Sequence, residues 1–258
     1  MSITQAPADT DVVVRLDQVS KQYGHGPGAL LALDRVSLTV RQGEFVCLLG
    51  ASGCGKSTLL SLVAGLDEIS GGTLDTGGRH VSLMVQEPAL FPWLSVSANV
   101  ELPLRLKGVG TRERRRRAEV VLEVVRLKGF GGKRPHELSG GMRQRVALAR
   151  ALAQDADILL MDEPFGALDA LTREQMNAEL NRIWRETGTT VVLVTHSIAE
   201  AVFLGTRIEV MTARPGRILR TFDVDLPPHR EYARVMSDPR FDRLATELRG
   251  LLGSGANH

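Results

Sequence analysis

One short stretch of the sequence has the residue types and the spacing of a loop that binds phosphate groups. It reads G-x-x-x-x-G-K-S and follows an apolar, β-prone run at residues 45–49. Glycines let backbone N–H groups turn toward an anion, and the helix expected next points its positive N-terminus at the same place. The lysine can reach the outer phosphates of a nucleotide, and the serine hydroxyl can ligate Mg²⁺. The predicted nucleotide-binding residues are Gly50, Ala51, Ser52, Gly53, Cys54, Gly55, Lys56, Ser57 and Thr58.

Two acidic residues and a histidine follow two other runs that are expected to be buried strands. Asp162 and Glu163 come after the apolar run at 158–161, and His196 follows the run at 190–195. Open α/β sheets bind ligands at the carboxyl ends of their strands. There Asp162 can hold Mg²⁺ or its water, Glu163 can polarise an attacking water, and His196 can face the terminal phosphate. A surface acid pair and a structural histidine are the alternatives.

A second candidate anion site lies at residues 138–145, which read LSGGMRQR. Ser139 is placed to cap a helix, and Gly140 and Gly141 expose backbone N–H groups in its first turn. An ordinary cap does not require two glycines, because each costs about 1 kcal/mol relative to alanine inside a helix. The chain therefore carries two candidate phosphate sites.

Length and composition fit a cytoplasmic α/β protein. The 258 residues can form one domain, with or without an inserted subdomain. With 32 basic and 30 acidic residues the net charge is +2, which gives no reason to expect a nucleic-acid partner. The start lacks the pattern of a signal peptide, and no apolar run approaches the roughly 20 residues of a membrane span. We expect Cys47 and Cys54 to be reduced thiols.

Three aromatic residues have two possible roles each. Tyr23 stands before a loop rich in glycine, where it can stack on an adenine ring, worth about 1–3 kcal/mol, or serve as a partly buried structural residue. Phe91 and Trp93 lie in a loop after a strand predicted at 81–86. They can pack under a neighbouring helix or form a docking surface for a partner.

The remaining pattern is that of alternating strands and helices. Strands are predicted at 12–16 and 36–40, and a long amphipathic helix at 170–187. Another helix at 111–126 carries an arginine cluster at 112–117. A solvated helix face is the first interpretation of that cluster, and contact with anionic lipid headgroups is the second.

Taken together, these motifs resemble those of the ATP-binding cassette (ABC) family. The resemblance covers about residues 11–225, and the LSGG signature separates it from other phosphate-loop enzymes. The segments at 87–93, 164–173 and 211–218 further resemble the nitrate, sulfonate and taurine importer ATPases of bacteria. The motifs that carry the family resemblance are, in order, Lys56, Gln86, Leu138-Ser139-Gly140-Gly141, Asp162-Glu163, Asp169 and His196.

The resemblance implies an α/β fold of the P-loop NTPase type, with a RecA-like core and an antiparallel β subdomain. The ABC ATPase domain would span 11–225, with a helical subdomain inserted at about 87–150, and 226–258 would form a short C-terminal tail without a regulatory domain. Between Gly72 and Gln86 the chain is shorter than members usually are, so one hairpin of the antiparallel subdomain is expected to be trimmed.

Residue roles also follow from the resemblance. Tyr23 matches the adenine-stacking position, and Gln86 matches the glutamine that senses Mg²⁺ and the water. Glu163 matches the general base, and His196 the residue that senses the γ-phosphate. The metal ligands would be Ser57, Gln86 and Asp162. Ser139, Gly140, Gly141 and Asp169 would act on the ATP of a second cassette.

The implied function is that of an ATP-hydrolysing subunit of a bacterial importer for a small anionic solute of the sulfonate, taurine or nitrate type. Its cofactors would be ATP and Mg²⁺. Its partners would be membrane-spanning permease subunits, docked on the segment after Gln86, a second cassette in a homodimer, and a periplasmic or lipid-anchored solute-binding protein. It would lie peripherally on the cytoplasmic face of the inner membrane and bind no nucleic acid.

Two other functions were weighed. A soluble cassette protein acting on nucleic acid or ribosomes is disfavoured by the single cassette, the near-neutral charge and the lack of a long coiled-coil insertion. A phosphate-loop kinase for a small metabolite would explain Lys56 and Asp162, but would leave the LSGG segment and His196 without a role.

Overall fold

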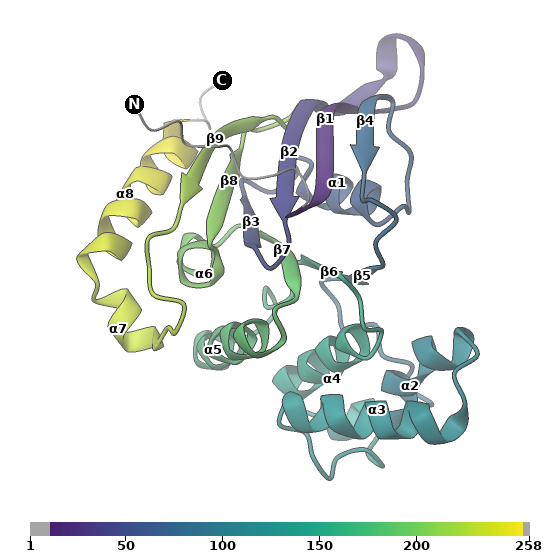
Figure 1. The fold of residues 1–258 in the computed structure, drawn as a ribbon. Coiled ribbons are helices and arrows are strands. Elements are labelled where there is room, and N and C mark those ends of the chain that lie inside the picture. Colours follow the sequence, from purple (N-terminus) through teal and green to yellow (C-terminus); the bar gives the residue numbers. More distant parts are fainter. Residues whose placement is uncertain (1–10, 255–258) are drawn as a thin grey trace, which may run out of the picture.

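The computed structural model describes residues 11–254 and contains two β-sheets, with most of the helices to the left of and below them in Figure 1. The larger sheet has the strand order β5-β6-β7-β3-β8-β9. Its first five strands are parallel, and β9 runs antiparallel to β8. The α/β class expected from the sequence is confirmed. The strands are β3 (Phe45–Leu49), β5 (Val81–Met84), β6 (Ile158–Asp162), β7 (Thr190–Thr195), β8 (Arg207–Met211) and β9 (Ile218–Asp223).

Strand β3 is buried on both faces, and its residues alternate between two hydrophobic cores. Phe45, Cys47 and Leu49 pack in a core with helices of the chain's second half. Val46 and Leu48 pack on the other face, with α1 (Lys56–Val63) and the smaller sheet. A parallel strand covered on both sides reads as a continuous apolar run, which is why the sequence predicts this strand correctly. The end of β3 is thus fixed from both sides.

The smaller sheet is antiparallel, with the order β2-β1-β4. Its strands are β1 (Val12–Tyr23), β2 (Leu30–Arg41) and β4 (Gly71–Asp75). The first two are longer than the predicted 12–16 and 36–40. Irregular register and positive φ angles at Gln18 (50°) and Arg35 (48°) interrupt the alternation, so only the regular part of each strand is visible in the sequence.

Three helices form a separate lobe, at the lower right of Figure 1. They are α2 (Val96–Leu106), α3 (Thr111–Val124) and α4 (Gly140–Leu152), and each contacts the other two. The predicted helix at 111–126 is thus two residues shorter, and the predicted strand at 81–86 ends at Met84. Helices α5 (Ala170–Thr187) and α6 (Ile198–Leu204) contribute to the core on the opposite face of the larger sheet from α1.

After β9 the chain packs back on α6 through α7 (Tyr232–Met236) and α8 (Pro239–Ser254). Arg230, which is 5% exposed, donates hydrogen bonds to the carbonyls of Val202, Phe203 and Gly205 at the end of α6. Burial lowers the pKa of this guanidinium to about 10. Within residues 11–254, none of the helices has the length and apolar character needed to cross a bilayer.

Candidate functional site

The predicted phosphate loop lies between the buried end of β3 and the start of α1. Gly53 and Gly55 adopt left-handed φ angles of 76° and 100°. A Cβ on Gly55 would lie 2.7 Å from Leu33 Cδ2 and 2.9 Å from the Ala32 carbonyl, so only glycine fits there. Ala51, Ser52 and Gly53 are exposed. The loop therefore presents its outer turn to solvent while its last glycine is held against β2.

Lys56, at the start of α1, points back into the loop and is 4% exposed. Its Nζ donates to the carbonyls of Gly50 at 2.8 Å and Ala51 at 2.9 Å, and lies 3.7 Å from Cys54 Sγ. The ammonium is thus held at the mouth of the loop by neutral acceptors. A phosphate oxygen is a stronger, charged acceptor for the same group.

Ser57 and Asp162 meet across the gap between α1 and β6. Ser57 Oγ donates to Asp162 Oδ1 at 3.0 Å. Burial raises the pKa of Asp162, and the bond from Ser57 opposes that shift. These are hard oxygen donors of the kind that Mg²⁺ prefers. Among residues 11–254, no group of three or more His, Cys, Asp and Glu side chains is placed to hold a metal ion. The protein side of a Mg²⁺ site would consist of Ser57, Asp162 and the predicted ligand Gln86, with phosphates and water as further ligands.

Glu163, His196 and Gln86 lie around one point at the carboxyl edge of the sheet. Glu163 has a left-handed φ of 42°, and its Oε2 is 3.1 Å from His196 Nδ1. A Cβ on Gly166 would lie 3.5 Å from Gln86 Nε2 and 3.8 Å from Glu163 Oε2. The Glu163 side chain is 20% exposed and that of His196 58% exposed, so the edge is open to a solvent molecule or a ligand.

The LSGG segment and Asp169 lie together, away from the phosphate loop. Ser139 caps α4 by accepting from Met142 N at 3.3 Å, as its sequence position predicts. A Cβ on Gly141 would stand 2.7 Å from Thr172 Cγ2, in the helix that Asp169 caps. The bond from the Thr172 amide lowers the pKa of Asp169. In Figure 1 the start of α4 is in the lower lobe, and α1 lies behind the upper strands.

Tyr23 is half-exposed at the end of β1. Its hydroxyl donates to Asp67 Oδ2 at 2.9 Å, and Lys21 Nζ lies 4.8 Å from the ring centroid. Asp67 also accepts from Lys21, so the three side chains form one group. The ring retains an exposed surface of the kind needed for stacking, and the stacking role stays a prediction.

Two residues of α4 that the sequence did not single out hold the loop after β5. Gln144 Nε2 donates to the Gln86 carbonyl at 3.2 Å, and Arg150 donates to the carbonyls of Pro88 and Ala89, each at 2.8 Å. Gln144 is 2% exposed, and its Oε1 has no hydrogen-bond partner. No local pattern marks either residue, because their acceptors lie 58 to 62 residues earlier in the chain. The loop is therefore tied to the helix that the LSGG segment begins.

The same loop presents two aromatic rings to solvent. Phe91 is 38% and Trp93 67% exposed, and their centroids are 5.5 Å apart. The buried Asn99 side chain accepts from Phe91 N at 2.8 Å and donates to the Phe91 and Leu94 carbonyls, which fixes the loop. The packing alternative is therefore wrong for Trp93, and docking stays a prediction.

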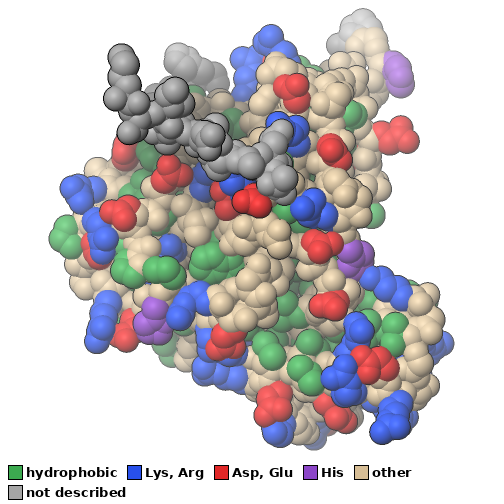
Figure 2. Space-filling view, viewed as in Figure 1, with side chains coloured by type: hydrophobic (Ala, Val, Ile, Leu, Met, Phe, Trp, Pro, Cys, Tyr) green, Lys and Arg blue, Asp and Glu red, His purple; other side chains and the backbone are tan. Residues whose placement is uncertain are grey.

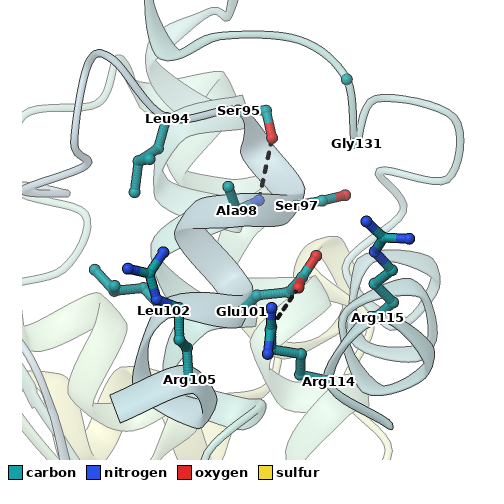
Figure 3. Close-up of a pocket in the computed structure, with 11 residues that line it drawn as sticks. Leu94, Ser95, Ser97, Ala98, Glu101, Leu102, Arg105, Arg114, Arg115 and Gly131 are labelled. Atoms are coloured by element: carbon teal, nitrogen blue, oxygen red, sulfur yellow. Dashed lines mark hydrogen bonds and ion pairs between the residues drawn. The ribbon is translucent and has the colours of Figure 1, made fainter. Parts of the chain in front are cut away.

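A hollow of about 480 Å³ begins at Leu94, beside these rings. Figure 3 shows its lining between α2 and α3, with Glu101 paired to Arg114 at 3.0 Å and Arg105 and Arg115 on its two sides. The arginine cluster of α3 is thus divided, because Arg114 turns inward while others remain on the solvated face.

A parallel sheet in which β3 leads into the phosphate loop and β6 ends in the adjacent carboxylates of Asp162 and Glu163 defines a phosphate-loop NTPase. A family model described as ABC transporter matches residues 33–166. The chain belongs to the ABC transporter family and is an ATPase of that family.

Named relatives and solved structures agree with this assignment. The chain is 50% identical over 244 residues to the taurine import ATP-binding protein TauB of Burkholderia pseudomallei (strain 1710b), covering 90% of this chain and 93% of the relative. It is 43% identical to the nitrate import ATP-binding protein NrtD of Synechocystis sp., covering 87% and 89%, and 45% identical to the aliphatic sulfonates import ATP-binding protein SsuB of Bacillus licheniformis, covering 88% and 89%.

Among solved structures, the dimeric post-hydrolysis state of the ATP-binding cassette MJ0796 bound to ADP and Pi superimposes with a TM-score of 0.72. That chain is 37% identical, and the match covers 83% of this chain and 100% of that one. A second dimeric structure of MJ0796, described as a bacterial ABC transporter cassette, matches with the same TM-score at 36% identity.

Proposed function

We propose that this chain is the ATP-hydrolysing subunit of a bacterial importer that takes up a small anionic solute of the taurine, sulfonate or nitrate class. The observation that carries the proposal is the 50% identity to a taurine import ATP-binding protein over 90% of the chain. The named relatives are import proteins, which disfavours action on nucleic acid. Figure 2 shows basic and acidic side chains interspersed on one face, which also argues against a nucleic-acid surface.

The residues at the sheet edge can perform the hydrolysis. Lys56 and the loop N–H groups bind the phosphates, and Ser57, Asp162 and Gln86 would hold Mg²⁺, which when bound neutralises charge on the phosphate oxygens. Glu163 orients a water and accepts its proton as the water oxygen attacks the γ-phosphorus and the bond to ADP breaks. His196, 3.1 Å from Glu163, orients that carboxylate and would contact the γ-phosphate.

A second copy of the chain would complete each ATP site. Ser139, Gly140 and Asp169 are exposed and Gly141 is buried, and together they form one group at the start of α4 and α5. In Figure 1 this part of α4 lies in the lower lobe, apart from α1, which follows the phosphate loop. Pairing two copies head to tail would bring this group to the partner's ATP. The dimeric cassettes of similar fold support such pairing.

The remaining partners follow from the importer assignment. Phe91, Trp93 and the hollow beside them would receive a cytoplasmic segment of the permease, which would hold the chain peripherally at the inner face of the membrane. A solute-binding protein outside the membrane would deliver the anion. The proposed ATPase domain spans 11–225, with the helical subdomain at about 87–150, and the tail spans 226–258.

Growth of the host tests this function. A strain that lacks the gene should fail to grow when taurine, an alkanesulfonate or nitrate is the only source of sulfur or nitrogen, and the failing source names the solute. The wild-type gene should restore growth. The Glu163→Gln variant should not, although the purified variant still binds ATP. Undiminished growth of the deletion strain on all three sources would contradict the proposal.

A capture experiment tests whether Phe91 and Trp93 form the docking surface for the permease. Tagged wild-type chain captured from solubilised host membranes should retain a multi-span permease, and the Phe91→Ala/Trp93→Ala double variant should lose it while keeping its ATP affinity. Leu219→Ala is a matched control, because Leu219 is also exposed, at 48%, but lies on β9. Equal recovery of the permease by all three proteins would rule out this surface.

A further inference from the structure

One side chain, that of Arg173 on α5, donates to three carbonyls of the loop between Glu163 and Asp169. Its Nε donates to the Phe165 carbonyl at 3.3 Å, and its Nη2 donates to the carbonyls of Gly166 at 3.4 Å and Leu168 at 2.8 Å. The planar guanidinium offers its donors in a fixed fork. A shift of the loop must therefore move the guanidinium with it.

Arg173 also faces a buried carboxylate on α6. Glu200 is 5% exposed, and its Oε1 lies 3.7 Å from Arg173 Nε. Its Oε2 accepts from Thr195 Oγ1 at 2.6 Å. The same Thr195 hydroxyl oxygen accepts from Ser197 N at 2.9 Å. Glu200 thus fixes the residues on both sides of His196.

These contacts form a continuous polar path between two parts of the ATPase. At one end is the loop that leads to Asp169, which the proposed function assigns to the contact with a second copy. At the other end is His196, whose ring bonds to Glu163. The Arg173 side chain is 34% and that of Glu200 7% exposed, and an ion pair held partly out of water contributes little net stability compared with an apolar replacement. Stability alone therefore does not account for this pair.

We propose that Arg173 and Glu200 are a positioning pair, which couples the position of the loop at 163–169 to the orientation of His196. The inference rests on the proposed function, because it assumes that Glu163 and His196 act on ATP. The pair touches neither substrate nor reacting atoms, and it acts by holding those that do. Contact of Asp169 with a second copy would then be transmitted to the hydrolytic edge.

Steady-state ATPase measurements on the purified full-length chain test the pair. Glu200→Gln keeps the hydrogen bond to Thr195 but removes the negative charge. Arg173→Met removes the guanidinium and its hydrogen bonds to the three loop carbonyls. We expect each to lower kcat by about threefold to thirtyfold, the range for coupling through a contact network, with less than about twofold change in KM and an unchanged Tm. Arg173→Lys keeps the positive charge but lacks the planar set of donors, so it should recover part of the lost kcat.

Two combinations separate positioning from general packing. The Arg173→Met/Glu200→Gln double variant should be no slower than the worse single variant. In a His196→Ala background, Glu200→Gln should have no further effect on kcat. Arg185→Met, on the exposed side of the same helix, is the matched control and should leave kcat unchanged.

Additive losses in the double variant, an unchanged kcat in both single variants, or losses that follow a fall in Tm would overturn the inference. Failure of the proposed function looks different. In that case the wild-type chain would hydrolyse no ATP, or its turnover would survive Glu163→Gln.

Discussion

The phosphate loop and the LSGG segment are both predicted to bind an anion through backbone N–H groups, but different parts of the fold hold them. The loop follows a strand that is buried on both faces, and its last glycine fits against β2. The LSGG segment begins a helix of the smaller lobe and packs on α5 near Asp169. One chain would therefore supply the rigid half of an ATP site and, on a separate lobe, the half that serves another copy.

The largest expected effect comes from dividing the two halves between chains. A dimer with Lys56→Ala in one copy and Ser139→Arg in the other should keep one intact composite site. A dimer with both changes in the same copy should keep none. ATP bound per dimer, measured in a Glu163→Gln background, distinguishes the arrangements. One ATP in the dimer that carries both changes in one copy, and none in the other dimer, would show that each site lies within one chain.

The contact between the LSGG segment and α5 gives the next effect. A methyl group on Gly141 would stand 2.7 Å from Thr172 Cγ2, so Gly141→Ala should destabilise the fold by about 1–3 kcal/mol in urea unfolding. Thr172→Ser removes that methyl and should restore most of the loss. Gly140→Ala, whose Cβ would lie 3.7 Å from Leu168 Cδ2, is the control and should be nearly neutral. A similar loss at Gly140 would argue against the contact.

The direction of the pKa shifts also distinguishes the sheet edge, with Asp162, from the helical lobe, with Glu113. Burial raises the pKa of Asp162, so its stabilising contribution exists below the unfolded pKa and is lost as the pH rises through the folded pKa. Asp162→Asn should therefore raise the Tm of the nucleotide-free chain slightly near pH 7 and have no effect near pH 3. Metal-dependent turnover should fall. A lower Tm near pH 7 would contradict this.

The smallest effect is expected on α3, where the sign is opposite. Hydrogen bonds from Arg116 and Arg117 lower the pKa of Glu113 to about 2. Its contribution is therefore present above the unfolded pKa and is lost as the pH falls toward about 2. Glu113→Gln should lower Tm slightly at pH 7, and the difference should vanish in acid. Glu119→Gln on the same exposed helix is the control, and an equal decrease there would remove the specific role of Glu113.

The sequence predicts best where one short segment determines the local structure. The helix at 170–187, the strand at 190–195 and the cap at Ser139 have the expected bounds, because capping residues and continuous apolar runs are local signals. The residues that bring distant segments together left no such signal. Arg173 and Glu200 read as ordinary helix-surface charges until folding places them 3.7 Å apart.

Arg230 illustrates the same limit in the tail. An arginine after two prolines suggests a solvent-exposed loop, yet it is buried and donates to carbonyls at the end of α6. Its acceptors are backbone atoms 25–28 residues away, and no side-chain pattern marks them. The roles of the predicted ATP-site residues remain predictions, although the structure places Gln86, Glu163 and His196 around one point.

Because Trp93 is exposed, its fluorescence can report binding at the proposed docking surface. Trp93 and Trp184 are the only two tryptophans of the chain. Trp184 packs edge-on against Phe45 and donates to the Gly43 carbonyl at 3.1 Å, whereas Trp93 is 67% exposed. In a Trp184→Phe variant, all indole emission arises from Trp93, in the loop after β5. A blue shift and protection from acrylamide quenching would then follow the arrival of a permease in real time, without an attached dye.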